Sequence, residues 1–327
     1  MKAWLCRSFD GIGSLGFADL PAPALRPGMV RIRMRAAALN FPDLLMPSGR
    51  YQVRPALPFV PGLEGMGEVV ETAADVDRFA RGARVMTYAG LSCFAEEAVV
   101  PAALVHAVPD GMGDAQAAGF VLAYGTAWHA LVDRGRLRDG ETVLVLGAAG
   151  GVGLPAVEIA AARGCTVIAV AGSPRKREAC REHGAAVVLD SGGDLRAQLR
   201  DAGLDGRLDI VYDPVGGDAT EPALRSLGRY GRLLVVGFAA GGVPALRANL
   251  LLLKQAEAIG VSFRQFAQDM PDAARAAVAD LAGLFAAGHL RPRIGNELPF
   301  AELPAAAALL QRREAIGKVI LRIAPVA

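Results

Sequence analysis

The sequence predicts an α/β fold in which a doubly wound parallel sheet is joined to a second, mostly β domain. Between residues 142 and 237, continuous apolar strands alternate with helical segments, a pattern typical of a parallel sheet covered on both faces. The first part of the chain instead contains short β-like runs broken by Pro and Gly, which indicates a small β domain. A chain of 327 residues is long enough for both domains.

The elements of the β domain come first in chain order. Its strands are expected at 30–39, 67–71, 83–88 and 94–100. Turn residues such as Pro27-Gly28 and Pro61-Gly62 separate these runs. A helical spacing of apolar residues then covers 114–133 and ends near a glycine, as helices often do.

The parallel sheet follows, with right-handed crossovers expected between its strands. We expect its strands at 142–147, 166–172, 186–190, 208–213 and 232–237. The helices between and after them are expected at 151–163, 174–183, 194–202 and 219–228. Two Ala-rich helices are then predicted at 273–287 and 302–313, and a final strand at 318–323 is expected to return to the β domain.

The composition excludes several classes of protein. Hydrophobic residues make up 53% of the chain and aromatics only 6%, so we expect a core of Ala, Val and Leu. The formal net charge is +2 and no basic stripe is present, so nucleic-acid binding is not expected. The sequence shows neither a signal-peptide pattern nor a run of about 18 apolar residues, the length that a membrane helix needs. We therefore expect a cytoplasmic protein without a membrane segment.

The cysteines give no sign of a metal site. Cys6, Cys93, Cys165 and Cys180 are far apart in the sequence and form no CxxC pair. A structural zinc site or a disulfide framework needs closer, patterned spacing. We expect free thiols.

A glycine-rich string follows the strand TVLVLG and opens a helix. It reads Ala148, Ala149, Gly150, Gly151, Val152, Gly153, which is the dinucleotide fingerprint G-x-G-x-x-G with alanine in the first position. Gly150 lets the backbone approach a pyrophosphate, Gly153 lets the helix pack on the strand, and the helix N-terminus attracts the phosphates. Because the string lies between a strand and a helix, we predict cofactor binding at Ala149, Gly150, Gly151 and Val152.

The next strand ends in the sequence AVAGSPRKR, where an acidic residue would favour NAD by binding the ribose 2′-hydroxyl. Gly172 and Ser173 leave room at this point, and Lys176 with Arg175 or Arg177 can supply positive charge to a 2′-phosphate. The alternative is that the three cations are a solvated first helical turn, although cations at a helix N-terminus oppose the helix dipole. We predict NADPH as the cofactor, bound by Gly172, Ser173, Lys176 and Arg177.

Several stretches carry a family resemblance that extends over nearly the whole chain. They read LNFPDLLMPSGRYQVRPALPFVPGLEGMGEVVE at 39–71, YGTAWHAL at 124–131, VLVLGAAGGVGLPA at 143–156, DPVGG at 213–217, GRLLVVGF at 231–238 and GKVIL at 317–321. They resemble the medium-chain dehydrogenase/reductase superfamily, and within it the zinc-independent quinone oxidoreductases related to zeta-crystallin. The resemblance implies a GroES-like catalytic domain at 1–121 completed by 264–327, a Rossmann domain at 122–263, and an active site in the cleft between them.

The sequence departs from the superfamily's zinc enzymes at their metal ligands. Where those enzymes have a cysteine ligand, this chain has Asn40 or its neighbours, and where they have Gly-His-Glu it reads Gly62-Leu63-Glu64. Leucine cannot coordinate zinc, and a catalytic zinc needs three protein ligands. The lobe of four closely spaced cysteines is also missing. We therefore expect no metal.

The resemblance also suggests the remaining site residues. Asn40 and Tyr51 are the catalytic candidates, Asn40 because it would contact the nicotinamide ribose or the substrate. Tyr51 matches the tyrosine that related enoyl thioester reductases are thought to use as a proton donor or oxyanion stabiliser. The alternatives are a turn-stabilising amide for Asn40 and a packing aromatic for Tyr51. Further cofactor-binding candidates are Asn40, Thr126, Gly237, Phe238, Phe263 and Lys318, and Lys318 could instead only cap a strand.

Without a metal, such a site can transfer hydride only to an electrophile that is already activated. The first hypothesis is therefore an NADPH-dependent quinone oxidoreductase that transfers hydride or electrons to quinones. The alternative is an NADPH-dependent reductase of enones or of enoyl thioesters bound to CoA or a carrier protein. A third hypothesis is a protein that binds NADPH without vigorous catalysis. The sequence does not distinguish the physiological acceptor, or one-electron from two-electron transfer.

The resemblance finally implies a homodimer. Members of this family commonly pair their Rossmann sheets edge to edge through the last strand, here EAIGVSF at 257–263. An exposed edge strand of this composition would favour association in any case.

Overall fold

The structure is a computed structural model that describes residues 1–323. It divides into two compact units, which are described separately. The first consists of Met1–Leu122, Ala267–Val278 and the described part of Pro292–Ala327, and the second of Ala123–Phe266 and Ala279–Arg291. This division differs from the expected domain boundaries at Leu122, which it assigns to the first unit, and at 264–266 and 279–291, which it assigns to the second unit. The continuous helix α10 (Pro271–Ala286) belongs partly to each unit, so no break in the sequence marks the boundary.

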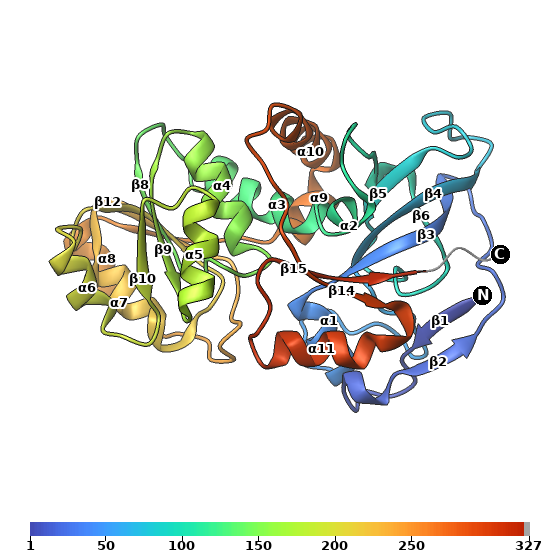
Figure 1. The fold of residues 1–327 in the computed structure, drawn as a ribbon, viewed down its shortest axis with the longest axis horizontal. Coiled ribbons are helices and arrows are strands. Elements are labelled where there is room, and N and C mark those ends of the chain that lie inside the picture. The colour runs from blue at the N-terminus through green and yellow to red at the C-terminus, as the bar shows by residue number, and fades with distance from the viewer. Residues whose placement is uncertain (324–327) are drawn as a thin grey trace. The chain divides into compact units, whose positions relative to one another are not determined.

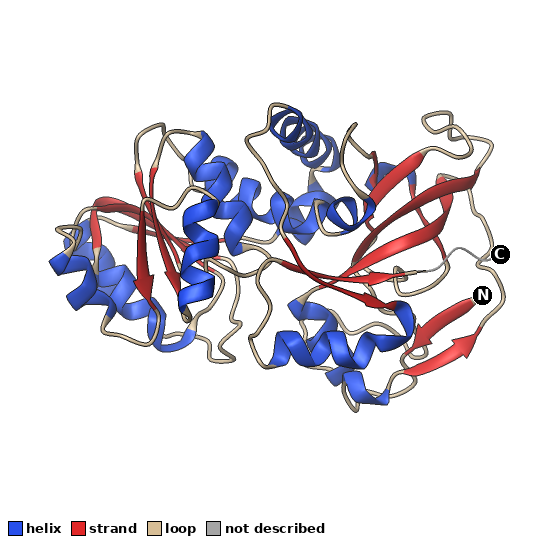
Figure 2. Ribbon diagram, viewed as in Figure 1, coloured by secondary structure: helices blue, strands red, loops and turns tan. Residues whose placement is uncertain are grey.

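The first unit is built on a mainly antiparallel sheet with the strand order β14-β15-β3-β4-β5-β7, in which β6 also pairs with β3 (Figure 2). Its strands are β3 (Met29–Leu39), β4 (Glu64–Thr72), β5 (Arg84–Tyr88), β6 (Glu97–Pro101), β7 (Val105–Ala107), β14 (Ile294–Pro299) and β15 (Lys318–Arg322). A separate hairpin pairs β1 (Lys2–Leu5) with β2 (Gly16–Asp19). The C-terminal strand thus returns to the β domain, as the sequence predicted, by pairing with β3.

The register of this sheet brings distant residues together at one point. Val319 lies opposite Leu39 in the antiparallel pair of β15 and β3. Ala38 lies opposite Glu64 in the pair of β3 and β4. The end of β3 and the starts of β4 and β15 therefore meet, and the short helix α1 (Phe41–Leu45) begins there.

The single helix predicted over 114–133 is wrong. The structure has α2 (Asp114–Ala118), a break at Gly119, α3 (Val121–Trp128) and a π-helical turn at His129–Arg134. A regular apolar spacing conceals this break, because the interactions that require it come from outside the segment. The N–H of Leu122, in the first turn of α3, donates to the Glu64 carboxylate at 2.9 Å.

The second unit is a parallel sheet with the strand order β10-β9-β8-β11-β12-β13. This is the strand order of a doubly wound dinucleotide-binding sheet. From β8 the chain adds strands first toward one edge of the sheet and then, from β11 onward, toward the other edge. The strands are β8 (Thr142–Val145), β9 (Thr166–Ala171), β10 (Val187–Asp190), β11 (Leu208–Asp213), β12 (Leu227–Val235) and β13 (Glu257–Gly260). The predicted fold class, a Rossmann-type parallel sheet with a GroES-like β domain, is confirmed.

Helices cover both faces of the parallel sheet (Figure 1). One face carries α4 (Gly153–Ala162) and α5 (Pro174–Glu182), and the other carries α6 (Leu195–Asp201), α7 (Thr220–Arg225) and α8 (Ala248–Lys254). A buried core lies between the sheet and the helices α6–α8 and consists of Leu, Ile, Val and Ala side chains. The strands contribute Leu144, Val211 and Leu233 to it. The remaining helices are α9 (Phe263–Asp269) and, in the first unit, α11 (Leu303–Gln311).

The predicted helix at 219–228 is shorter than expected. A 3-10 turn at Gly217–Ala219 precedes α7, and β12 already begins at Leu227. Leu227 is drawn into the sheet because it pairs with Leu208 of β11, a long-range contact that local propensity does not report. Among residues 1–323, none of the helices combines the length and the apolar character that are needed to cross a bilayer.

Candidate functional site

The glycine-rich string forms the loop between β8 and α4, at the point where the strand order of the sheet reverses. The carbonyl of Gly147 accepts from the N–H of Gly150 at 3.0 Å, and the carbonyl of Gly150 accepts from the N–H of Gly153 at 3.1 Å. A Cβ on Gly153 would lie 2.4 Å from the Gly147 oxygen and 2.6 Å from the Ala148 oxygen. Only glycine therefore lets α4 begin this close to the strand.

Two backbone donors of this loop have no acceptor within the described chain. The N–H groups of Gly151 and Val152 make no hydrogen bond there, and both immediately precede the ten-residue helix α4. The unsatisfied N–H groups and the helix dipole together make such a position attractive to an anion. The loop therefore has the donors and the close backbone approach that a pyrophosphate requires.

The end of β9 carries no carboxylate. Gly172 and Ser173 lead into α5, where the Ser173 hydroxyl caps the helix by accepting from the Lys176 N–H at 3.3 Å. Arg177 folds back over the turn, and its Nη1 donates to the carbonyls of Ala171 and Gly172, both at 3.3 Å. The same atom lies 3.1 Å from Oδ2 of Asp190, the last residue of β10. Arg177 therefore braces this turn and offsets the nearest carboxylate.

A third group of predicted residues follows β11 and β12. The buried Asp213 carboxylate shapes the DPVGG turn by accepting from the N–H groups of Val215 and Gly216, each at 2.8 Å, and from the Thr220 hydroxyl. Gly237 donates its N–H to the Asp213 carbonyl. The half-exposed Phe238 ring packs against Gly216, where a Cβ would be 2.9 Å from it. These loops lie at the carboxyl ends of the parallel strands, where ligands of such sheets bind.

Thr126 is half-buried on α3. The residue before it, Gly125, packs against the ring of Phe263. The Phe263 ring lies so close to Gly125 that a Cβ there would be 2.5 Å from the ring. One turn along, the His129 ring stacks on Phe266 with centroids 4.0 Å apart, and its Nδ1 lies 2.9 Å from the Asp133 carboxylate. The start of α9 is thus fixed against α3 and the π-helical turn.

A buried carboxylate also ties α3 to the helix that follows the glycine-rich loop. Glu158 on α4 accepts from the Tyr124 hydroxyl and is paired with His183 Nδ1, both at 2.6 Å. It also accepts from the Arg291 N–H at 3.1 Å. The burial of Tyr124 and the nearby Glu158 carboxylate raise the pKa of this phenol. Tyr124 is thus a neutral donor that anchors the helix carrying Thr126.

The first unit brings Asn40, Glu64 and Lys318 into one buried cluster. The Lys318 amine donates to Asn40 Oδ1 at 2.6 Å and to Glu64 Oε1 at 2.8 Å. The exposed fractions are 7% for Asn40, 0% for Glu64 and 5% for Lys318, so water contributes little to their solvation. The sheet register explains the contact, because these residues lie at the end of β3 and the starts of β4 and β15.

The hydrogen bonds of Asn40 restrict what its side chain can do. Its Nδ2 donates to Glu64 Oε1 at 3.1 Å and to the Ala38 carbonyl at 3.3 Å, and its Oδ1 accepts from Lys318. An amide has two donor protons, and both are engaged. Asn40 can therefore offer a further ligand only its remaining acceptor capacity.

Asp43 lies beneath this cluster on α1. Its Oδ2 accepts from the Asn40 N–H at 2.9 Å, which caps the helix. Burial raises the pKa of Asp43 to about 7, although the hydrogen bond from Asn40 partly opposes the shift. Burial likewise raises the pKa of the nearby Cys93 thiol, so Cys93 is an un-ionised core residue.

The other catalytic candidate, Tyr51, is half-buried in the loop after Gly49 and Arg50, outside any helix or strand.

Comparison with known proteins gives the chain a family. The family descriptions "Alcohol dehydrogenase GroES-like domain" and "Zinc-binding dehydrogenase" match residues 26–110 and 151–279. Quinone oxidoreductase-like protein 2 of Bos taurus is 35% identical, over 98% of this chain and 97% of its own length. The quinone oxidoreductase of Pseudomonas aeruginosa is 35% identical over 96% and 97%. The solved structure of mycobacterial Rv1454c complexed with NADPH has a TM-score of 0.92 and 30% identity, and covers 99% of this chain and 100% of that one.

The chain belongs to the medium-chain dehydrogenase/reductase superfamily. Its relatives are quinone oxidoreductase-like, so the family expected from the sequence motifs is confirmed. As a member of this superfamily, the protein is an oxidoreductase.

One matching family is described as a zinc-binding dehydrogenase, but this chain lacks a zinc ligand where the superfamily's zinc enzymes have a histidine. Leu63 precedes Glu64, and an aliphatic side chain has no donor atom for zinc. Over residues 1–323, His, Cys, Asp and Glu side chains form no group of three or more that could hold a metal ion. The absence of zinc remains a prediction.

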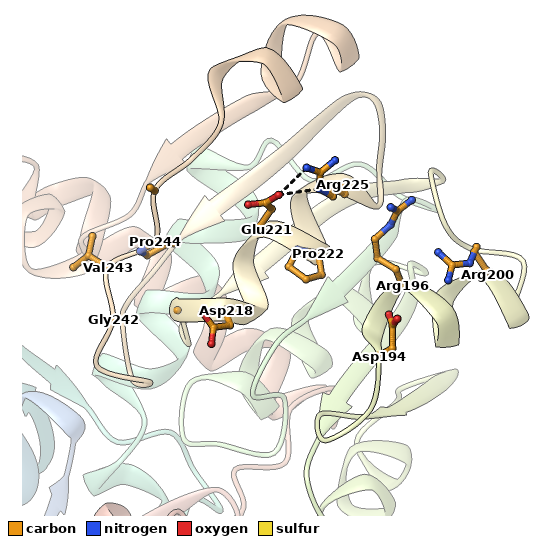
Figure 3. Close-up of a pocket in the computed structure, with 12 residues that line it drawn as sticks. Asp194, Arg196, Arg200, Asp218, Glu221, Pro222, Arg225, Gly242, Val243 and Pro244 are labelled. Carbon is orange, nitrogen blue, oxygen red and sulfur yellow. Dashed lines mark hydrogen bonds and ion pairs between the residues drawn. The ribbon is translucent and has the colours of Figure 1, made fainter.

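A pocket of about 690 Å³ lies elsewhere in the second unit of this oxidoreductase (Figure 3). Its wall includes Arg196, Arg200 and Arg225, together with the carboxylates of Asp194, Asp218 and Glu221. Arg225 is paired with Glu221 at 2.7 Å, and Arg196 with Asp205 at 2.8 Å. With equal numbers of positive and negative side chains, this wall does not favour a phosphate. The predicted cofactor residues do not line it.

Sequence reasoning missed two residues that organise the candidate site of this oxidoreductase. Gly119 and Glu158 contact predicted site residues or their helices, but they stand in no motif with them. Glu64 stands in the Gly62-Leu63-Glu64 segment that the sequence already singles out, but the sequence does not show that this carboxylate pairs with Asn40 and Lys318.

Proposed function

We propose that this oxidoreductase is an NADPH-dependent quinone oxidoreductase. The observation that carries the proposal is the loop between β8 and α4, where Gly151 and Val152 offer free N–H groups at a helix N-terminus. The lack of a carboxylate at the end of β9 supports NADPH over NADH. The relatives named as quinone oxidoreductases support the acceptor, and the NADPH complex of the mycobacterial relative supports the cofactor.

The residues of the second unit would bind the nucleotide. We assign the pyrophosphate to the backbone of Ala149, Gly150, Gly151 and Val152. We assign the 2′-phosphate to the Ser173 hydroxyl and Lys176, with Gly172 leaving room and Arg177 offsetting Asp190. Thr126, Gly237, Phe238 and Phe263 are proposed to contact the nicotinamide end. When bound, NADPH supplies a hydride.

The residues of the first unit would then stabilise negative charge on the acceptor or the cofactor. Hydride addition to a quinone places charge on oxygen, which hydrogen-bond donors must stabilise. The Tyr51 hydroxyl is one proposed donor, and the Lys318 amine is another. Because both amide protons of Asn40 are engaged, we propose that Asn40 acts by orienting Lys318 and by accepting a hydrogen bond.

One observation favours the alternative, an enone or enoyl-thioester reductase. The Arg54 guanidinium lies over the Phe9 ring, 4.4 Å from its centroid, and Gly49 of the Tyr51 loop lies beside both. Arg54 has no ion-pair partner within residues 1–323, so it could attract the phosphates of a CoA thioester. One cation can neutralise only a small part of the charge on the CoA phosphates, so we rank the thioester reductase second.

An acceptor screen tests the proposal. We expect NADPH oxidation with naphthoquinone and phenanthrenequinone at a kcat/KM at least roughly tenfold above that with crotonyl-CoA, a difference of about 1.4 kcal/mol in transition-state binding. A clear preference for crotonyl-CoA would overturn the quinone assignment in favour of the alternative. Saturable NADPH binding without turnover of any acceptor would support a binding protein instead.

The proposed homodimer would use β13, the edge strand of the parallel sheet as far as the chain is described. Glu257, Ala258 and Gly260 of this strand are exposed, and an open edge can pair with a second copy. Light scattering of the purified protein would report its mass. A monomer at micromolar concentration would contradict the proposal.

A further inference from the structure

The buried amine of Lys318 has a donor that no residue takes. Its two hydrogen bonds go to Asn40 Oδ1 at 2.6 Å and Glu64 Oε1 at 2.8 Å. An ammonium group has three protons, and no acceptor for the third lies within bonding distance in the part of the chain that the structure describes. A charge that is only 5% exposed would not ordinarily be left with an unused donor.

Stability alone is a weak explanation for this cluster. The desolvation cost of a buried ion pair can exceed the attraction between its charges, and apolar replacements are often as stable. The position could therefore hold apolar side chains, as the neighbouring Ala38, Leu39 and Val319 do. The cluster instead keeps a positive charge in a fixed place.

Glu64 is the residue that determines this place. Its Oε1 accepts from both Lys318 and Asn40, and its Oε2 accepts from the Leu122 N–H at 2.9 Å. The carboxylate is fully buried, and each of its two oxygens accepts at least one hydrogen bond. It joins the amine of Lys318 to the first turn of α3, the helix that also carries Thr126.

Gly119 provides the passage through which Lys318 reaches Glu64. It stands at the break between α2 and α3, where a Cβ would lie 2.8 Å from Lys318 Cε and 3.0 Å from its Cγ. Any other residue would press on the aliphatic stem of Lys318 along most of its length. The break that the sequence did not predict thus makes room for a lysine from the far end of the chain.

We propose that Glu64 and Gly119 are positioning residues, which together aim the free N–H of Lys318 at an anionic oxygen of the bound reactants. The proposal rests on the NADPH-dependent function above. The oxygen could belong to the nucleotide or to the reduced acceptor, and the kinetic constants distinguish these two sources. A nucleotide contact appears in the KM for NADPH, whereas a contact made only in the transition state appears in kcat.

The test compares Glu64→Gln and Gly119→Ala with the matched control Gly113→Ala. Glutamine keeps the shape of Glu64 but has one acceptor oxygen in place of two, so it must release either Lys318 or the Leu122 N–H. Alanine at 119 displaces Lys318 without removing any charge. Gly113 is the N-cap of the same helix α2, and a Cβ there would meet only Gln116 Oε1, at 3.6 Å.

We expect each of the two variants to change one kinetic constant by about tenfold, the effect of losing one well-placed hydrogen bond to a charged group. The control should stay within roughly twofold of wild type, because its contact is ordinary. Thermal unfolding of all three variants identifies changes that are only structural. If both variants lose stability but keep wild-type kcat and KM while folded, the proposal is overturned.

Wild-type behaviour keeps the two proposals separable. If wild type fails to bind NADPH or to oxidise it with any acceptor, the proposed function has failed. If wild type turns over and Glu64→Gln and Gly119→Ala match Gly113→Ala in both constants, only the positioning role has failed. Where Gly119→Ala does not fold, Glu64→Gln decides the question by the same comparison.

Discussion

The loop between β8 and α4 and the cluster around Glu64 offer charge to a ligand in two different ways. The loop uses backbone N–H groups at Gly151 and Val152 and has no charged side chain of its own. The cluster uses a buried lysine, Lys318, that a carboxylate and an amide hold in place. The loop is held by short contacts among neighbouring residues, whereas the cluster joins residues that are up to 278 positions apart.

This difference determines how each region responds to change. Apart from substitution by proline, no side-chain change removes a backbone donor, so other substitutions disturb the loop only through its shape or through the side chains beside it. A buried charge pair depends on both partners, and the loss of one leaves the other unpaired. The predictions below use this contrast.

The largest effect is expected at the end of β9, where side chains supplement the loop. The double substitution Ser173→Asp with Lys176→Ala adds a negative charge and removes a positive one beside the proposed 2′-phosphate site. Two hydrogen bonds to a charged group amount to about 3–6 kcal/mol before solvent exposure is discounted. We expect the ratio of kcat/KM for NADPH to that for NADH to fall by roughly 100-fold or more. Equal losses with both coenzymes would refute the assignment of these residues.

The next largest effect is expected on the pH dependence of stability, because Asp43 is a buried carboxyl group next to the cluster of Asn40, Glu64 and Lys318. Asp43 is only 1% exposed, and burial raises its pKa to about 7 from the ordinary value of 3.8. Between these pH values the folded protein keeps a proton that the unfolded chain releases, so stability falls as pH rises through this window. Relative to Asp43→Asn, wild type should lose on the order of a few kcal/mol between pH 4 and pH 7. Urea unfolding of both proteins across this range measures the difference.

His106 makes the comparison with Asp43→Asn necessary. Burial, followed by Arg78 and Arg275, lowers the pKa of His106 to about 4 from 6.5. The stability that this neutral histidine contributes is present above pH 6.5 and is lost as the pH falls, which is the opposite slope. The slope is common to both proteins and cancels in their difference. Parallel curves for wild type and Asp43→Asn would show that Asp43 does not carry the predicted dependence.

The smallest effect is expected for the shape of the loop alone. In Gly153→Ala, the new Cβ would be 2.4 Å from the Gly147 oxygen, so α4 must shift away from the strand. Overpacking of this kind costs about 1–3 kcal/mol. We expect NADPH affinity to fall by roughly 10- to 100-fold. Gly283→Ala is the control, because a Cβ there meets nothing within 4 Å. If the two variants bind NADPH equally well, the loop does not depend on this close approach.

The contrast between the two regions also explains what the sequence could predict. The parallel sheet and its loop follow from local signals: apolar strands, helical spacing and the glycines between Gly147 and Gly153. The break at Gly119 could not be predicted, because the contacts that accompany it, with the stem of Lys318 and between Leu122 and Glu64, come from outside the segment. The early start of β12 likewise depends on pairing with β11. Long-range packing overrode the local pattern in both places.

The candidate site shows the same limit. The family resemblance suggested Asn40 and Lys318 as candidates, but it did not show that they bond directly or that Glu64 joins them. The spacing around Arg177 indicated positive charge, but not its ion pair with Asp190. A sequence gives the residue types in a site. The hydrogen bonds that occupy those residues depend on strand register, which joins the two ends of this chain.

The most direct test of the central claim is a calorimetric titration of the wild-type protein with NADPH and with NADH. The free N–H groups before α4 and the carboxylate-free end of β9 predict saturable binding of NADPH, at least roughly tenfold tighter than that of NADH. Failure to bind either coenzyme, or tighter binding of NADH, would contradict the account.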